Sequence, residues 1–155
     1  MKYILDTSAI IDGFIPENSF TTEKVLLEVR DSESEFHLLS SISSGKLKVF
    51  QTREEHLRRV ERALKESGDN LSETDKDVVA LALQLSGVVV SSDYGIQNTC
   101  SILGIEYLSI SQEGIKVTKR WRYLCRGCGR EYPRFEKRCK DCGCEVKKVE
   151  VEGSS

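Results

Sequence analysis

The sequence contains no apolar run long enough to cross a membrane, and its start, MKYILD, meets an acidic residue too early for a signal-peptide core. We therefore expect a cytoplasmic chain without a membrane partner. Hydrophobic residues make up 39% of the chain and charged residues 31%, a balance typical of a folded protein and not of disorder. A length of 155 residues allows one ordinary domain, or a medium domain followed by a very small one.

Motifs that identify several common enzyme classes are also missing. The chain has no phosphate-binding P-loop, no G-x-G-x-x-G fingerprint, no G-x-S-x-G turn and no H-E-x-x-H zinc motif. The only two histidines, His37 and His56, lie in helical contexts that predict surface or half-buried positions. Chemistry based on these motifs is poorly supported, which leaves carboxylates and cysteines as the informative residues.

Positive charge is scarce in most of the chain and concentrated at its end. Residues 1–115 carry 11 Lys+Arg against 19 Asp+Glu, a net charge of −8, whereas residues 116–155 carry 12 against 6, a net charge of +6. A basic segment attached to an acidic body often binds nucleic acid, although a solvated basic surface is an equally good interpretation of charge alone.

The first 110 residues alternate β-rich apolar runs with helical patterns, which predicts an α/β fold with a parallel sheet flanked by helices. We expect strands at 3–5, 46–50, 87–91 and 105–110. Capping boxes at Thr52 with Glu55, and at Ser72 with Asp75, predict the starts of two helices, and Gly68 and Gly87 are expected to end them. Further helices are expected at 21–29, 34–42 and 94–103.

The remaining sequence predicts a small second unit. Residues 119–151 contain short β-prone stretches separated by cysteine pairs and no helical pattern, which indicates a small β zinc ribbon. The expected organisation is therefore a first domain at 1–112, a linker at 113–118, the ribbon at 119–151 and a tail at 152–155.

Asp6 and Asp93 each follow directly from a predicted strand, so both are expected at the carboxyl edge of the sheet, where parallel sheets bind ligands. Asp75 falls on the apolar stripe of its helix and is either a capping acid or a member of the same site. Asp77, about 200° further around the helix, is expected to face water. Clustered carboxylates need a positive partner, and Mg²⁺ or Mn²⁺ fits oxygen ligands best.

Four cysteines form two C-x-x-C pairs separated by ten residues, with glycine after each second cysteine. This spacing, in a chain without a secretory signal, predicts one structural zinc ion held by four thiolates. The ligands are Cys125, Cys128, Cys139 and Cys142. Cys144 is expected to be a free or packed thiol, with exchange into the site as the alternative, and Cys100 to be a packed apolar side chain.

Basic and aromatic residues surround these cysteines, and cations bind phosphate while exposed rings stack on unpaired bases. The alternative for some of the rings, especially Tyr123 and Phe135, is a place in the small core of the ribbon. The residues expected to bind nucleic acid are Lys119, Arg120, Trp121, Arg122, Arg126 and Arg130.

The motifs DTSAIID, VLLEV, LSETDKDVVALA and VVSSDYGIQN, followed by a four-cysteine ribbon, resemble the PIN-domain nucleases, and the whole chain resembles archaeal members of the Nob family. That resemblance implies an endoribonuclease that matures the 3′ end of small-subunit ribosomal RNA, with the precursor rRNA and the pre-ribosomal particle as partners. It also implies hydrolysis that leaves 5′-phosphate and 3′-hydroxyl ends.

By the same resemblance, one or two Mg²⁺ or Mn²⁺ ions would be held by Asp6, Glu28, Asp75 and Asp93. Residues that could assist them are Ser8, Asp77 and Asn98. The chain has Ser92 where relatives often carry a second acid next to Asp93, and Glu28 depends on the resemblance, since its position in the helix pattern is marginal. The alternative functions are a toxin-like or RNA-decay PIN ribonuclease and a non-catalytic RNA-binding adaptor.

Overall fold

The computed structural model describes the backbone of residues 1–111, 114–132 and 137–152, and the side chains of residues 1–110, 123–132 and 137–147. A parallel sheet forms its centre, with the strand order β3-β2-β1-β4-β5. The bounds of these strands are Tyr3–Leu5 (β1), Ser19–Thr21 (β2), Leu47–Val49 (β3), Val88–Ser91 (β4) and Tyr107–Ser111 (β5). The four expected strands are confirmed, whereas β2, only three residues long, was missed.

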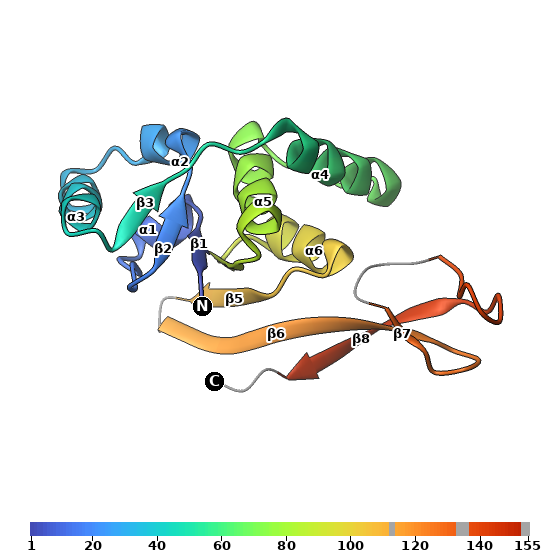
Figure 1. The fold of residues 1–155 in the computed structure, drawn as a ribbon. Helices are drawn as coiled ribbons and strands as arrows, with labels where there is room; N and C mark the ends of the chain where they lie inside the picture. Colours follow the sequence, from blue (N-terminus) through green and yellow to red (C-terminus); the bar gives the residue numbers. More distant parts are fainter. Residues whose placement is uncertain (112–113, 133–136, 153–155) are drawn as a thin grey trace.

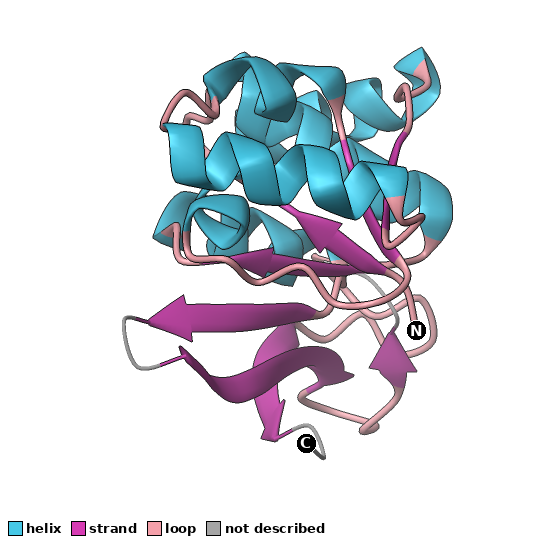
Figure 2. Cartoon of the chain, turned by 90° about the vertical axis from the view of Figure 1, so that its left-hand side faces the viewer, coloured by secondary structure: helices cyan, strands magenta, loops and turns pink. Residues whose placement is uncertain are grey.

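Helices cover this sheet (Figures 1 and 2). Their bounds are Thr7–Ile11 (α1), Glu23–Glu28 (α2), Ser32–Ser43 (α3), Glu54–Ser67 (α4), Glu73–Leu85 (α5) and Tyr94–Leu103 (α6). The five expected helices are confirmed, and α1 is an additional single-turn element. No helix of the described part of the chain is both long and apolar enough to cross a membrane.

The hydrophobic core lies between the central strands and the helices. Ile4 and Val89 on the strands and Val78 and Leu81 on α5 are fully buried in one continuous cluster. Burial of this apolar surface is the main term that stabilises the domain, and it fixes the ends of β1 and β4 relative to α5.

Two expected details of the helix ends are wrong. Thr52 does not cap α4: the helix begins after Arg53 without a side-chain cap, and the Thr52 hydroxyl donates instead to the Asp77 carboxylate. α5 begins after Ser72 as expected, but it ends at Ser86, whose φ of 54° is left-handed, and not at Gly87. Gly68 ends α4 with a φ of +79°, the conformation that glycine adopts without strain.

The C-terminal strands continue from the central sheet. β6 (Gly114–Cys125) pairs antiparallel with β5, and its second half pairs with β8 (Val146–Glu152) and with β7 (Glu131–Tyr132). The linker expected at 113–118 is therefore corrected for residues 114–118, which form the start of β6. Hydrogen bonding to β5 explains the difference, because it makes this stretch part of the sheet. The ribbon has its own small core, made of Tyr123, Cys125, Tyr132, Cys139 and Val146.

Candidate active site

Asp6 is a buried carboxylate at the carboxyl end of β1. It is 4% exposed and caps α1, where its Oδ1 accepts hydrogen bonds from the Ala9 N–H at 2.9 Å and the Ser8 hydroxyl at 2.7 Å. Its Oδ2 accepts a hydrogen bond from the Ser91 hydroxyl. Burial nevertheless raises the pKa of Asp6 above its ordinary value, and the negative charge of Asp93 adds to the rise.

Asp93 lies two residues beyond β4, the strand that pairs with β1, so both carboxylates stand at the same sheet edge, as expected. Asp93 caps α6 by accepting the Ile96 N–H at 3.0 Å. Its own N–H donates to the Ser91 hydroxyl oxygen at 3.0 Å. Ser91 is fully buried and thus connects the two acidic residues, a role that the sequence did not suggest.

Asp75 lies in the first turn of α5, where its backbone N–H donates to the Ser72 hydroxyl at 3.1 Å. Partial burial raises the pKa of its carboxyl group, and the charges of Asp93, Asp6 and Glu28 raise it further. Asp75 therefore lies three residues after the capping residue Ser72, as the capping box predicts, and its carboxyl group also interacts with the charges of the other three acids, which supports the alternative that it belongs to the same site.

Glu28 is the last residue of α2 and is exposed. Its Oε2 accepts a hydrogen bond of 2.8 Å from the Thr7 hydroxyl, and Thr7 directly follows Asp6. This contact holds the carboxylate of α2 towards the start of α1. Like Ser91, Thr7 is a supporting residue that the sequence did not reveal, because a hydroxyl next to an acid does not indicate a partner 21 residues away.

Two of the assisting residues lie elsewhere. Asp77 does not face water: it is 7% exposed and accepts a hydrogen bond from Thr52, because the segment before α4 crosses that side of α5. Asn98 donates to the Asp69 carboxylate at 2.6 Å. Ser8, by contrast, makes the expected hydrogen bond to Asp6 and also accepts the N–H of Ser92 at 3.2 Å.

The chemistry of this group of carboxylates fits a divalent cation. Within the described part of the chain, no lysine or arginine forms an ion pair with any of the four acids. Burial is the main reason why the pKa values of Asp6 and Asp75 are raised, and the negative charges of the neighbouring acids raise both further. Hard cations such as Mg²⁺ and Mn²⁺ take carboxylate oxygens and supply that compensation.

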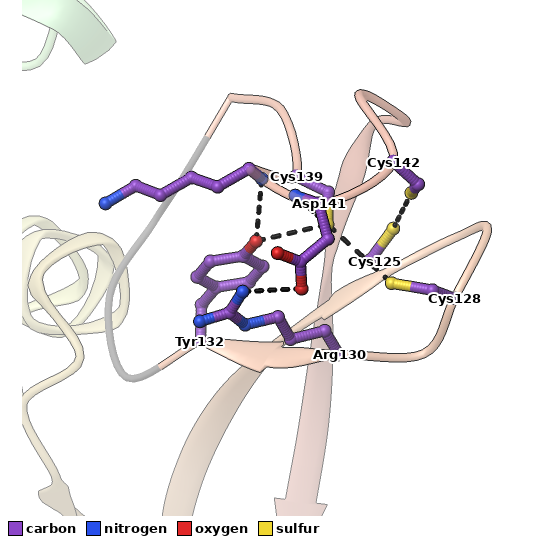
Figure 3. Close-up of polar contacts among 8 residues, drawn as sticks. Cys125, Cys128, Arg130, Tyr132, Cys139, Asp141 and Cys142 are labelled. Atoms are coloured by element: carbon purple, nitrogen blue, oxygen red, sulfur yellow. Dashed lines mark hydrogen bonds and ion pairs between the residues drawn. The ribbon is translucent and has the colours of Figure 1, made fainter.

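The ribbon holds a second candidate metal centre (Figure 3). The sulfurs of Cys125, Cys128, Cys139 and Cys142 all lie within 4.8 Å of one another. Two Sγ–Sγ distances are 3.2 Å (Cys125 to Cys142) and 3.7 Å (Cys128 to Cys139). Tetrahedral zinc with Zn–S bonds of about 2.3 Å requires sulfurs about 3.8 Å apart, so the four thiols fit a zinc ion with little adjustment.

Tyr132 supports one of these thiols. Its hydroxyl donates to the Cys139 sulfur at 3.1 Å and accepts the Lys140 N–H at 2.9 Å. The hydrogen bond from Tyr132 is the main reason why the pKa of Cys139 falls to about 6, which favours the thiolate that binds metal. This tyrosine is therefore a supporting residue of the cysteine site that the spacing did not reveal.

Cys144 lies beside the cysteine site. A Cβ placed on Gly127 would lie 2.7 Å from the Cys144 sulfur and 3.2 Å from that of Cys142, so this loop requires glycine. Cys100 is fully buried in the main core, as expected, and burial raises the pKa of its thiol.

The expected RNA-binding residues are only partly described. Arg126 is exposed. Arg130 forms an ion pair of 2.5 Å with Asp141 and lies 5.2 Å from the centre of the Tyr132 ring, so it also stabilises the ribbon. The backbone of Lys119, Arg120, Trp121 and Arg122 lies in β6, but their side chains are outside the described residues.

Comparison with known proteins agrees with this architecture. Residues 3–85 match the family model described as "PIN domain of ribonuclease". The chain is 42% identical to Endoribonuclease Nob1 of Pyrococcus abyssi, over 96% of this chain and 94% of that protein. It is 41% identical to Endoribonuclease Nob1 of Methanothermobacter thermautotrophicus, over 94% of this chain and 91% of that protein.

A relative with another name is Ribonuclease VapC1 of Thermoplasma acidophilum, which is 35% identical over 96% of this chain and 78% of that protein. The two Nob1 relatives above match at higher identity and over more than nine tenths of their own length. The chain therefore belongs to the Nob1 family of PIN-domain endoribonucleases.

Proposed function

We propose that this protein is a metal-dependent endoribonuclease that cleaves precursor ribosomal RNA at the 3′ end of the small-subunit rRNA, within the pre-ribosomal particle in the cytoplasm. The observation that carries the proposal is that Asp6, Asp93 and Glu28 all lie close enough to Asp75 for their charges to act on it, while burial and acidic neighbours raise the pKa of both Asp6 and Asp75. Membership of the Nob1 family supports the substrate class.

The four carboxylates would hold one or two Mg²⁺ or Mn²⁺ ions. When bound, such an ion acidifies water at neutral pH and stabilises negative charge on the reacting phosphate. The residues of the chain orient the ligands: Ser8 and Ser91 fix the two oxygens of Asp6, and Thr7 fixes Glu28. Because Asp6 is buried, its hydrogen bonds leave it little freedom to turn away from an ion. Hydrolysis would leave a 5′-phosphate and a 3′-hydroxyl.

RNA binding and catalysis would lie in different parts of the chain. The body of the chain is acidic and repels phosphate, whereas residues 116–155 are basic. We retain the division into a catalytic domain at 1–112 and a ribbon at 119–151, with zinc on the four cysteines as its structural ion. Exchanging Lys119, Arg120 and Arg122 for glutamine should lower the salt slope of RNA binding by about 2, because each phosphate contact to a single strand contributes about 0.7.

An unchanged salt slope in this triple variant would contradict the division. The control is a variant with an equal change of charge, in which Lys24, Lys46 and Lys65 of the acidic body are exchanged for glutamine and RNA affinity is measured in the same way. That control should retain the wild-type slope.

The decisive experiment for the activity is cleavage of a precursor RNA that spans the 3′ boundary, with Mn²⁺ or with EDTA. Asp6→Asn should abolish cleavage, because the ligand changes from a charged to a neutral oxygen donor without a change in size. Asp12→Asn is the matched control: Asp12 is an exposed acid at the end of the same helix and should keep full activity. Cleavage that persists in EDTA or in Asp6→Asn would refute the proposed mechanism.

The relative named Ribonuclease VapC1 supports an alternative, a ribonuclease that acts on other RNAs. The same assay separates the two, since a maturation enzyme cleaves the precursor at the 3′ boundary. Cleavage spread over unrelated RNAs at comparable rates would favour the alternative.

A further inference from the structure

Tyr94 carries the most exposed large apolar side chain among the described residues, at 86%. It is the first residue of α6 and directly follows Asp93, one of the four clustered acids. A ring held in water beside a charged site does not contribute to the core. The ring is therefore available to contact a bound ligand.

The direction of the ring follows from helix geometry. In an α-helix every Cα–Cβ bond tilts towards the N-terminus, so a side chain at the first position leans over the start of its helix. The start of α6 is where Asp93 accepts the Ile96 N–H, at the sheet edge that also carries Asp6. Neighbouring Cα atoms are about 3.8 Å apart, so the ring lies within about one nucleotide of the Asp93 carboxylate.

The rest of α6 leaves this surface clear. Ile96, Gln97, Thr99 and Cys100 are buried, whereas Asn98, four residues after Tyr94 on the same face, is exposed. Gly95, the residue after Tyr94, has no side chain to cover the ring. A Cβ at this position would lie 3.0 Å from the Asp93 oxygen and 3.1 Å from Leu71, which is tighter than an ordinary contact. The Asn98 amide is engaged with the Asp69 carboxylate, so the exposed face offers one aromatic ring, a group that binds an unpaired base by stacking.

We propose that Tyr94 is a stacking platform for an unpaired base next to the scissile phosphate, and that it positions single-stranded RNA across the four carboxylates. The inference rests on the proposed function, because it assigns a substrate contact to the same site. A phosphate backbone alone is repelled by these acids, so an uncharged contact at the edge of the site would help to hold the strand there.

The test compares Tyr94→Ala and Tyr94→Phe in the full chain. Tyr94→Ala should raise the KM for a single-stranded substrate by about 5-fold to 150-fold, the range that base stacking spans, and change kcat much less. Tyr94→Phe keeps the ring and should restore the wild-type KM. Phe36→Ala is the matched control, since Phe36 is 76% exposed on α3 and should be silent.

A second readout reports stacking directly. RNA with 2-aminopurine beside the cleaved bond should lose fluorescence on binding the non-cleaving Asp6→Asn protein, and keep it when Tyr94→Ala is added. A wild-type KM together with quenching in Tyr94→Ala would overturn the inference. A changed Mn²⁺ requirement would also overturn it, since that would mean that Tyr94 acts only by placing Asp93. If the wild type cleaved no RNA, the proposed function would fail, while the fluorescence titration would still decide the stacking.

Discussion

Removal of a single hydroxyl, in Ser91→Ala, should uncouple two of the clustered acids. Ser91 is fully buried, donates to Asp6 and accepts the N–H of Asp93 at 3.0 Å. Its loss removes a hydrogen bond to a charged group, worth about 1.5–3 kcal/mol, and leaves a backbone N–H without that partner. Since Ser91 lowers the pKa of Asp6 more than any other contact does, the pKa should rise further in the variant.

Both effects weaken metal binding, because a ligand must be deprotonated and correctly oriented. Loss of such a supporting contact costs about 10-fold to 100-fold in metal affinity or activity, so the Mn²⁺ concentration for half-maximal cleavage should rise by that factor. Ser41→Ala is the control, because Ser41 is also buried but bonds to the His37 carbonyl far from the acids. An unchanged Mn²⁺ dependence in a folded Ser91→Ala protein would show that Ser91 does not support the metal ligands.

Three further results are expected. Gly95→Ala should reduce cleavage more than thermal stability, because the new Cβ would lie 3.0 Å from the Asp93 oxygen while alanine favours the helix. Cleavage kinetics and thermal melts of the same variant measure the two effects, and wild-type activity would contradict the prediction. The acidic limb of the pH–rate profile should move to lower pH as the Mn²⁺ concentration increases, because the metal competes with protons for Asp6, whose pKa lies above its ordinary value. An acidic limb that does not depend on the Mn²⁺ concentration would contradict this prediction. Tyr132→Phe should release zinc at an about 10-fold lower chelator concentration than the wild type does, because the Cys139 sulfur loses the hydrogen bond from the Tyr132 hydroxyl. A colorimetric zinc assay measures the release, and release at the wild-type chelator concentration would contradict the prediction.

The pH dependence of stability follows from the same groups. The folded-state pKa of Asp6 is raised above the unfolded value, so the folded protein binds a proton more tightly than the unfolded chain does. Without metal, this carboxyl therefore destabilises the fold as pH rises from its ordinary pKa through its raised one. Bound cation offsets the effect, so added Mn²⁺ should raise the melting temperature more at pH 7 than at pH 4.

Strong local signals in the sequence predicted most of the fold. The apolar run Val88–Val90 predicted β4, and the capping serine Ser72 predicted the start of α5. Both signals come from residues next to one another in the chain, and the structure contains both elements. β2 was missed because Ser19 and Thr21 do not have an apolar pattern, and their place in the sheet comes from pairing with β1 and β3.

The site was predicted less completely, because its supporting contacts join residues far apart in the chain. Asp6 and Ser91 are 85 positions apart, and the hydroxyl of a serine at a strand end gives no sign of which acid it will meet. The capping box at Thr52 was wrong for a related reason: a tertiary partner, Asp77, took the hydroxyl that the local pattern had assigned to the helix start.

If the four carboxylates hold the catalytic cation, crystals soaked in Mn²⁺ should show an anomalous scattering peak beside the carboxylate oxygens of Asp6, Glu28, Asp75 and Asp93. In Asp6→Asn crystals this peak should disappear, while the zinc signal at the four cysteines persists. Mn²⁺ bound elsewhere, or bound equally well in Asp6→Asn, would show that these carboxylates do not hold the ion.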